Sequence, residues 1–306
     1  MGDLPPVDAH VHVLSPRLRA LAAMPSGARV PAAGGGAEQL VGLLRHHGVG
    51  GVVVVAVLGD DDYFWSAFHE TEDIQIWRVL AVGECPSPAA VSRTIEALSR
   101  PGVLGVRLRH LGSPNDRRSA ALPVFPILRA LAHHGKVLWI FTGIDQHRLL
   151  LRLLDELPVL ASVLNHMGAV PLADGVSAEG RPRLVFPTGG RRRQLRELAA
   201  HPEMRVILSG QYAISNQKFP YSDLRSHTDF LLTEFGPDRL LWGSDYPFVG
   251  SAEAYGEQLA WVRWVLPGAS ERELSAILGG NARRLGASER VPSIDPEGGH
   301  RFRGDE

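Results

Sequence analysis

The stretch PPVDAHVHVLSP, residues 5–16, places two histidines, His10 and His12, one residue apart within an apolar run. Side chains alternate between the two faces of a β-strand, so a strand here would carry both imidazoles on one face. Asp8 has the same parity and is expected on that face, deeper in the protein. Buried imidazoles are costly without partners, so the pair fits either a hydrogen-bonded polar core or half of a metal site.

Short runs rich in β-branched and apolar residues recur along the chain and alternate with amphipathic segments. Several runs are almost continuously apolar, which is typical of strands covered on both faces. Together with residues 6–13, the predicted strands are 51–58, 77–83, 103–109, 136–142, 159–166, 204–210 and 239–245. The predicted helices between and after them are 37–48, 62–72, 88–100, 121–135, 145–157, 190–201, 222–236 and 252–266.

Eight strands that are each followed by a helix predict an α/β fold of the (β/α)8 TIM-barrel type. A doubly wound open sheet is the competing architecture, but GGG at 34–36 follows no strand and provides no phosphate-binding fingerprint. A further helix over 270–285 is expected to close the barrel. We expect residues 1–288 to form a single barrel domain and residues 289–306, which are polar and rich in Pro and Gly, to be a disordered tail.

The composition of the 306 residues limits the classes of partner. The formal net charge is −1 and the isoelectric point is about 6.9, so nothing favours nucleic acid or an anionic membrane as a partner. Cys85 is the single cysteine, which excludes an internal disulfide framework and suits a reducing compartment. Neither a signal peptide nor an apolar run of about 18 residues is visible. We therefore expect a soluble cytoplasmic protein that acts on a small molecule, alone or as a homo-oligomer.

Polar side chains gather where the predicted strands end, and in a barrel of this type chemistry is located at the carboxyl ends of the strands. His166 follows the sixth strand and Asp245 follows the eighth, and both could meet His10 and His12 across the mouth of the barrel. Zinc binds imidazole nitrogens and carboxylates, and a catalytic zinc site leaves one position for water. The other polar residues at strand ends are Glu84, Arg107, Arg109, His110, Asn165, Ser209, Gln211, Tyr212 and Ser244.

Arg107 and Arg109 share one strand face, where arginine either forms a structural ion pair or clamps an anionic substrate group. We favour the clamp, with Arg107 as its main member, and expect Gln211, Tyr212 and Tyr221 to line the substrate site.

The positions of the lysines limit the chemistry further. The chain has only Lys136 and Lys218, and neither lies at the carboxyl end of a predicted strand. A binuclear centre bridged by a modified lysine is therefore not expected, and neither is Schiff-base chemistry. At most one metal ion is predicted.

An ordered set of motifs over residues 6–286 resembles the amidohydrolase-related family and, within it, the lactonase branch. The motifs are VDAHVHV, GVRL, VLNHMG, ILSG, FPYSDL, RLLWGSDYPF and ILGGNARRL. The branch includes 2-pyrone-4,6-dicarboxylate lactonase and sugar lactonases. Where those relatives often carry an arginine that binds a substrate carboxylate, this chain has Ala213.

The resemblance implies a (β/α)8 barrel in which His10, His12, His166 and Asp245 form the central site and Asp245 is the base that activates water. The leading hypothesis is hydrolysis of a lactone or a related cyclic ester or amide. One divalent metal, zinc first, would be bound by those four residues, although the pyrone lactonase works without a metal. The alternatives are a metal-dependent, non-oxidative decarboxylase of an aromatic or unsaturated acid, and a non-catalytic binding protein that keeps the barrel.

Overall fold

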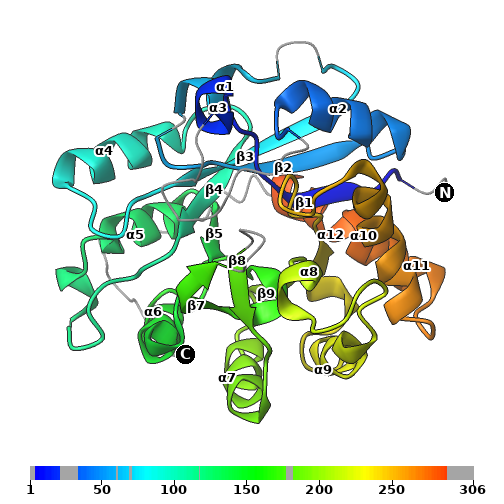
Figure 1. Ribbon diagram of the computed structural model, residues 1–306. Helices are drawn as coiled ribbons and strands as arrows, with labels where there is room; N and C mark the ends of the chain where they lie inside the picture. The colour runs from blue at the N-terminus through cyan, green and yellow to red at the C-terminus, as the bar shows by residue number, and fades with distance from the viewer. Residues whose placement is uncertain are drawn as a thin grey trace, which may run out of the picture.

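A computed structural model describes residues 4–20, 34–59, 61–68, 71–116, 118–176 and 182–287. Eight parallel strands form one sheet that curves into a barrel, in the order β1-β2-β3-β4-β5-β6-β9-β10 (Figure 1). This confirms the predicted (β/α)8 architecture. The strands are β1 (Val7–Val11), β2 (Gly51–Val55), β3 (Gln75–Ala81), β4 (Val103–Leu108), β5 (Val137–Ile140), β6 (Ser162–Leu164), β9 (Met204–Leu208) and β10 (Leu240–Trp242).

Helices follow the strands and surround the barrel (Figure 1). Both faces of the strands are buried: Val53, Trp139 and Leu241 pack in the inner cluster, while Val52 and Val54 pack in the larger cluster beneath the helices. The helices are α1 (Pro16–Arg19), α2 (Ala37–His46), α3 (Asp61–Ser66), α4 (Pro88–Ala97), α5 (Phe125–His133), α6 (His147–Glu156), α7 (Gly189–Ala199), α8 (Gln211–Ile214), α9 (Arg225–Phe235), α10 (Ala252–Val265), α11 (Glu271–Ser275) and α12 (Asn281–Ala287).

The barrel closes between β1 and the segment that follows β10. The backbone N–H of His12 donates to Tyr246 O at 2.7 Å, and the N–H of Asp245 donates to His10 O at 2.9 Å. Val11 and Tyr246 form an isolated parallel bridge at the same seam. The seam that closes the barrel is therefore made by the backbone of the residues expected in the site.

A β-bulge in β1 changes which side chains face the barrel interior. Val7 and Ala9 pack in the inner cluster, but Val11 packs in the outer one, and the pairing with β2 shifts between Asp8 and Val11. An extra residue in a strand reverses the alternation of its side chains. The expectation that Asp8 shares a face with His10 and His12 is therefore wrong. Asp8 accepts from the N–H groups of His10 (3.2 Å) and Ser244 (2.9 Å) instead.

Two further segments differ from the sequence expectations. The long stretch after β6 contains a hairpin of β7 (Val170–Val176) and β8 (Pro182–Val185), which pair antiparallel apart from the barrel. The helix expected over 270–285 is observed as α11, a π-helical turn at Ala276–Gly280, and α12. The tail expected to be disordered, residues 289–306, lies outside the described residues.

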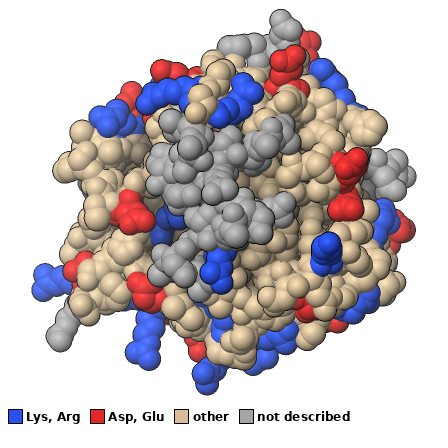
Figure 2. All heavy atoms as spheres, viewed as in Figure 1, with Lys and Arg blue, Asp and Glu red and all other residues tan. Residues whose placement is uncertain are grey.

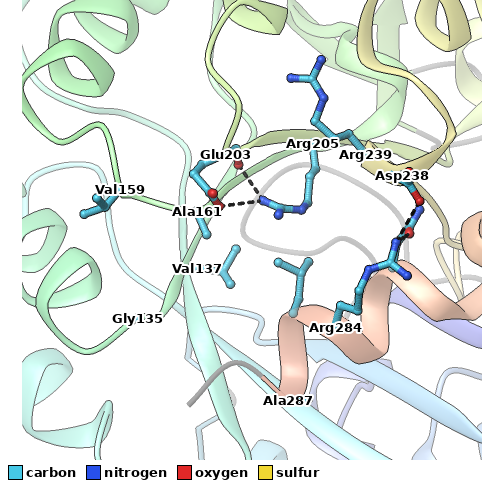
Figure 3. A pocket seen from close by; sticks show the side chains of 12 residues that line it. Gly135, Val137, Val159, Ala161, Glu203, Arg205, Asp238, Arg239, Arg284 and Ala287 are labelled. Carbon is cyan, nitrogen blue, oxygen red and sulfur yellow. Dashed lines mark hydrogen bonds and ion pairs between the residues drawn. The ribbon is translucent and has the colours of Figure 1, made fainter. Parts of the chain in front are cut away.

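The amino end of the barrel is covered by α12, whose Ala282 and Leu285 pack into the inner cluster. A cavity of about 640 Å³ lies there, between α12 and the starts of β5, β6 and β9. Figure 3 shows Glu203 with Arg205 on one side of it and Asp238 with Arg284 on the other, each pair joined by hydrogen bonds and ion pairs. In barrels of this type the amino end serves stability rather than chemistry.

The outer surface fits the balanced composition. In the view of Figure 2, basic and acidic side chains are interspersed around the rim of the visible face. Within the described residues, no helix is long and apolar enough to cross a membrane.

Candidate active site

The carboxyl ends of β1, β6 and β10 bring together the four residues expected at the centre of the site. Oδ1 of Asp245 lies 3.6 Å from Nε2 of His10 and 3.8 Å from Nε2 of His12. The ring centroids of His10 and His12 are 5.0 Å apart, and those of His10 and His166 are 5.2 Å apart. All four side chains are buried. We call His10, His12, His166 and Asp245 the central cluster.

Two members of the central cluster have unusual backbone conformations. Asp245 has φ = 60° and His166 has φ = 50°, both in the left-handed region. Each such residue costs about 1–3 kcal/mol, and non-glycine residues of this kind gather at functional sites. Asp245 is held there by the seam, through its N–H bond to His10 O.

Hydrogen bonds orient the members of the central cluster. Nδ1 of His12 donates to Val55 O at 2.7 Å, so Nε2, which lies 3.8 Å from Oδ1 of Asp245, carries the lone pair. The hydroxyl of Tyr212 donates to Oδ2 of Asp245 at 2.5 Å, which leaves Oδ1 facing the imidazoles. Nδ1 of His166 forms a hydrogen bond of 3.1 Å with Oγ of Ser209. These partners fix which atoms of the central cluster can bind or react.

Three members of the central cluster offer atoms that could hold one metal ion. A nitrogen from His10, one from His12 and an oxygen of Asp245 all lie within 4.8 Å of one another. In a tetrahedral zinc site, bonds of about 2.0–2.1 Å place neighbouring donor atoms about 3.4 Å apart, close to the observed 3.6 and 3.8 Å. Neither ring nitrogen of the buried His10 has a hydrogen-bond partner among the described residues. The donor set therefore fits a single metal ion.

Burial sets the protonation states of the central cluster. Desolvation lowers the pKa of His10 and of His12 well below the usual value, and it lowers the pKa of His166 to about 3, with nearby arginines adding to the effect. The three rings are therefore neutral at pH 7. Desolvation raises the pKa of Asp245 to about 7, against opposing effects of the Tyr212 hydrogen bond and the Arg107 charge. A carboxyl group in this range can both take and release a proton near neutral pH.

Both arginines expected to bind an anion lie beside the central cluster and are partly buried. Arg107 donates to Ala56 O (3.1 Å) and, through Nη1, to Nε2 of His12 (3.4 Å). The guanidinium of Arg109 lies 5.6 Å from the ring centre of Phe141, and that ring packs edge-on against His166.

The three predicted lining residues have different surroundings. Tyr212 meets Asp245 directly. The buried Gln211 donates to Leu208 O at 3.3 Å, and its Oε1 has no partner among the described residues. The hydroxyl of Tyr221 accepts from Nε2 of Gln258 on α10 at 3.3 Å, in the helix layer rather than at the central cluster.

Sequence reasoning missed two partners of His166. The sequence indicates Ser209 only as a polar residue at a strand end, and it gives no indication of Phe141, which follows β5. An aromatic residue that packs on a histidine leaves no spacing signal in the sequence.

Comparison with known proteins identifies the family of this chain. The family model described as Amidohydrolase matches residues 7–285. L-fucono-1,5-lactonase of Burkholderia ambifaria is 31% identical over 110 residues, which are 35% of this chain and 33% of the relative. The chain thus matches about a third of the length of this curated relative.

Solved structures match over nearly the whole chain. An amidohydrolase from Burkholderia multivorans with bound zinc has a TM-score of 0.67 at 21% identity, covering 93% of this chain and 99% of that one. A protein from Pseudomonas putida assigned as a 2-pyrone-4,6-dicarboxylic acid hydrolase has a TM-score of 0.65 at 25% identity, covering 92% and 97%. Because the family model spans almost all of the barrel, the chain belongs to the amidohydrolase family.

Proposed function

We propose that this protein is a hydrolase that opens a lactone, or a related cyclic ester or amide, by attack of an activated water. The placement of Asp245 carries the proposal: Oδ1 faces the two imidazoles of β1, while Oδ2 receives the Tyr212 hydroxyl. Membership of the amidohydrolase family and the likeness to a sugar lactonase support the same reaction.

Asp245 supplies the proton transfers of the proposed reaction. Its carboxylate takes a proton from water while the water oxygen bonds to the carbonyl carbon of the ring. The same carboxyl group then returns the proton to the ring oxygen as the carbon–oxygen bond breaks. Tyr212 holds Oδ2 during both steps, so that Oδ1 remains directed into the central cluster.

Arg107 and Arg109 would bind an anionic group of the substrate at the barrel mouth. A planar guanidinium can form two parallel hydrogen bonds to a carboxylate. Arg109 is the better placed of the two, because the hydrogen bonds of Arg107 go to Ala56 and His12.

The proposed cofactor is one zinc ion held by His10, His12 and Asp245, with His166 beside them. When bound, zinc would polarise the substrate carbonyl as a Lewis acid. The lone pair of Nε2 in His12 can bind a metal or accept from Arg107, but cannot do both. Zinc binding therefore requires that the contact between Arg107 and His12 be released.

The test is a panel of sugar lactones, carboxylated lactones and aromatic acids, assayed before and after treatment with a chelator and after zinc is restored. We expect ring opening of at least one lactone class, loss of rate on chelation, and recovery with zinc. Lactone turnover that survives complete metal removal would support the metal-free form of the mechanism and contradict the zinc assignment.

The same panel separates the alternatives. Release of carbon dioxide from an aromatic acid, with no lactone opened, would assign the decarboxylase reaction instead. Binding of panel compounds without any turnover would assign a non-catalytic barrel. Either result would contradict the proposed hydrolase.

A further inference from the structure

The turn that carries His166 has an uncommon backbone. The segment η3, His166–Gly168, has three consecutive residues in the left-handed region, with φ values of 50°, 56° and 70°. Among the described residues, two local backbone hydrogen bonds stabilise it, from Gly168 N to Asn165 O (3.0 Å) and from Ala169 N to His166 O (2.9 Å). Chain segments of this kind persist only where their surroundings hold them.

Two buried side chains on the surrounding helices bind the carbonyl oxygens of this turn. Nε2 of His227, on α9, donates to Met167 O at 2.9 Å. Nε of Arg191, on α7, donates to Gly168 O at 2.8 Å. Neither residue contacts the central cluster in the hydrogen bonds of the described residues, so their roles are not explained by the proposed reaction.

Both donors are buried side chains that can hold the backbone of the turn in place. His227 is fully buried, and burial lowers its pKa to about 4, so its ring is neutral and has one N–H to donate. Arg191 is 9% exposed, an uncommon place for a guanidinium. Helix α7 also packs directly on the turn: a methyl group at Gly168 would lie 2.5 Å from Cδ2 of Leu195.

We propose that Arg191 and His227 are positioning residues that clamp the turn at residues 166–168 and thereby aim the His166 imidazole at the other members of the central cluster. The clamp acts on backbone carbonyls from outside the barrel, so it adds no group to the chemistry. The role of the clamp in catalysis rests on the proposed function of His166. Its effect on the structure of the turn can be tested without any lactone turnover.

The test uses matched pairs of variants. His227→Gln keeps an N–H at a reach similar to Nε2, whereas His227→Met has a similar shape and no donor. Arg191→Lys keeps a donor, whereas Arg191→Met does not. Arg193→Met, an exposed residue of the same helix, is the control.

Hydrogen–deuterium exchange of the peptide that contains residues 165–169 is the first measurement. We expect the two methionine variants to exchange at least tenfold faster there, with the Gln and Lys variants close to wild type and the control unchanged. Residues that support a ligand from outside typically change metal affinity or activity by about 10- to 100-fold. We therefore also expect kcat on the responsive lactone to fall about 10- to 100-fold in the methionine variants, with KM little changed.

Equal exchange in the methionine and wild-type proteins would overturn the clamp, as would Gln and Lys variants that are as defective as the methionine ones. If the methionine variants do not fold, His227→Asn replaces them, because its amide is one bond shorter and cannot reach Met167 O. Faster exchange in that variant supports the clamp, and unchanged exchange overturns it. If neither wild type nor any variant opens a lactone, the proposed function is contradicted. The hydrogen–deuterium exchange rates still test the clamp in that case.

Discussion

The hydroxyl of Tyr212 lies 2.5 Å from Oδ2 of Asp245 and leaves Oδ1 as the oxygen that faces His10 and His12. The sequence placed Tyr212 just after a strand and indicated only a lining residue. The contact depends on the short helix α8, which begins after Gly210 in a left-handed conformation. Residue type and spacing cannot predict such a contact, because it depends on how that turn directs the ring.

Removing this hydroxyl should lower turnover with little effect on the fold. In Tyr212→Phe, Oδ2 of a buried carboxylate loses its donor, and an unsatisfied buried group costs about 1–3 kcal/mol. We expect kcat to fall about tenfold or more, measured on the lactone identified by the panel. Tyr63→Phe is the control, because the Tyr63 hydroxyl accepts from Ala37 N and forms no hydrogen bond with the central cluster among the described residues. Equal kcat in Tyr212→Phe and wild type would contradict the role given to Tyr212.

The alternation of side chains along β1 predicts the placement of some residues correctly and of others wrongly. Period-two alternation placed His10 and His12 on one face, and the structure has them together at the central cluster. The same alternation failed for Asp8, since the bulge in β1 lies between Asp8 and Val11. The bulge is stabilised by the carboxylate itself, which accepts from N–H groups of β1 and of the segment after β10. No local sequence rule predicts a bond between residues 236 positions apart.

Asp8 should therefore stabilise the strand without taking part in the reaction. Asp8→Ala leaves two buried N–H groups unpaired, and we expect it to lower the free energy of unfolding by about 3 kcal/mol. Asp8→Asn keeps an acceptor oxygen, so its loss of unfolding free energy should be clearly smaller. Denaturant unfolding measures both, and equal losses in the two variants would rule out hydrogen bonding as the cause.

The barrel as a whole can be predicted from the hydrophobic pattern of the sequence. Apolar strands alternating with amphipathic helices predict the (β/α)8 ring, and the observed strands lie inside the predicted ranges or within two residues of them. The closing seam could not be predicted, because β1 bonds to Asp245 and Tyr246 in the segment after β10 rather than to β10 in a regular ladder. The hairpin β7–β8 is not predicted either, because the predicted elements include none between the strand that ends at residue 166 and the helix that begins at residue 190.

The burial of His227 predicts how the stability of the whole molecule depends on pH. Its pKa is lowered by burial from 6.5 to about 4. Between these values the unfolded chain binds a proton that the folded chain does not, so stability falls as the pH falls, by up to about 3 kcal/mol. His227→Gln removes this contribution. Between pH 7 and pH 4, the unfolding free energy of wild type should therefore fall by up to about 3 kcal/mol more than that of the variant. Equal pH dependence of the unfolding free energy in the two proteins would contradict this prediction.

The most direct test of the proposed catalytic centre is the rate of lactone ring opening by Asp245→Asn relative to wild type. Asn keeps the shape of Asp but cannot take a proton, and loss of a general base typically costs about 100- to 10,000-fold. Asp238→Asn, at the amino end of the barrel, is the matched control. We predict a loss in that range for Asp245→Asn, with a native unfolding curve and an unchanged control. A folded Asp245→Asn protein that opens the lactone at a near wild-type rate would contradict the assignment of Asp245 as the base.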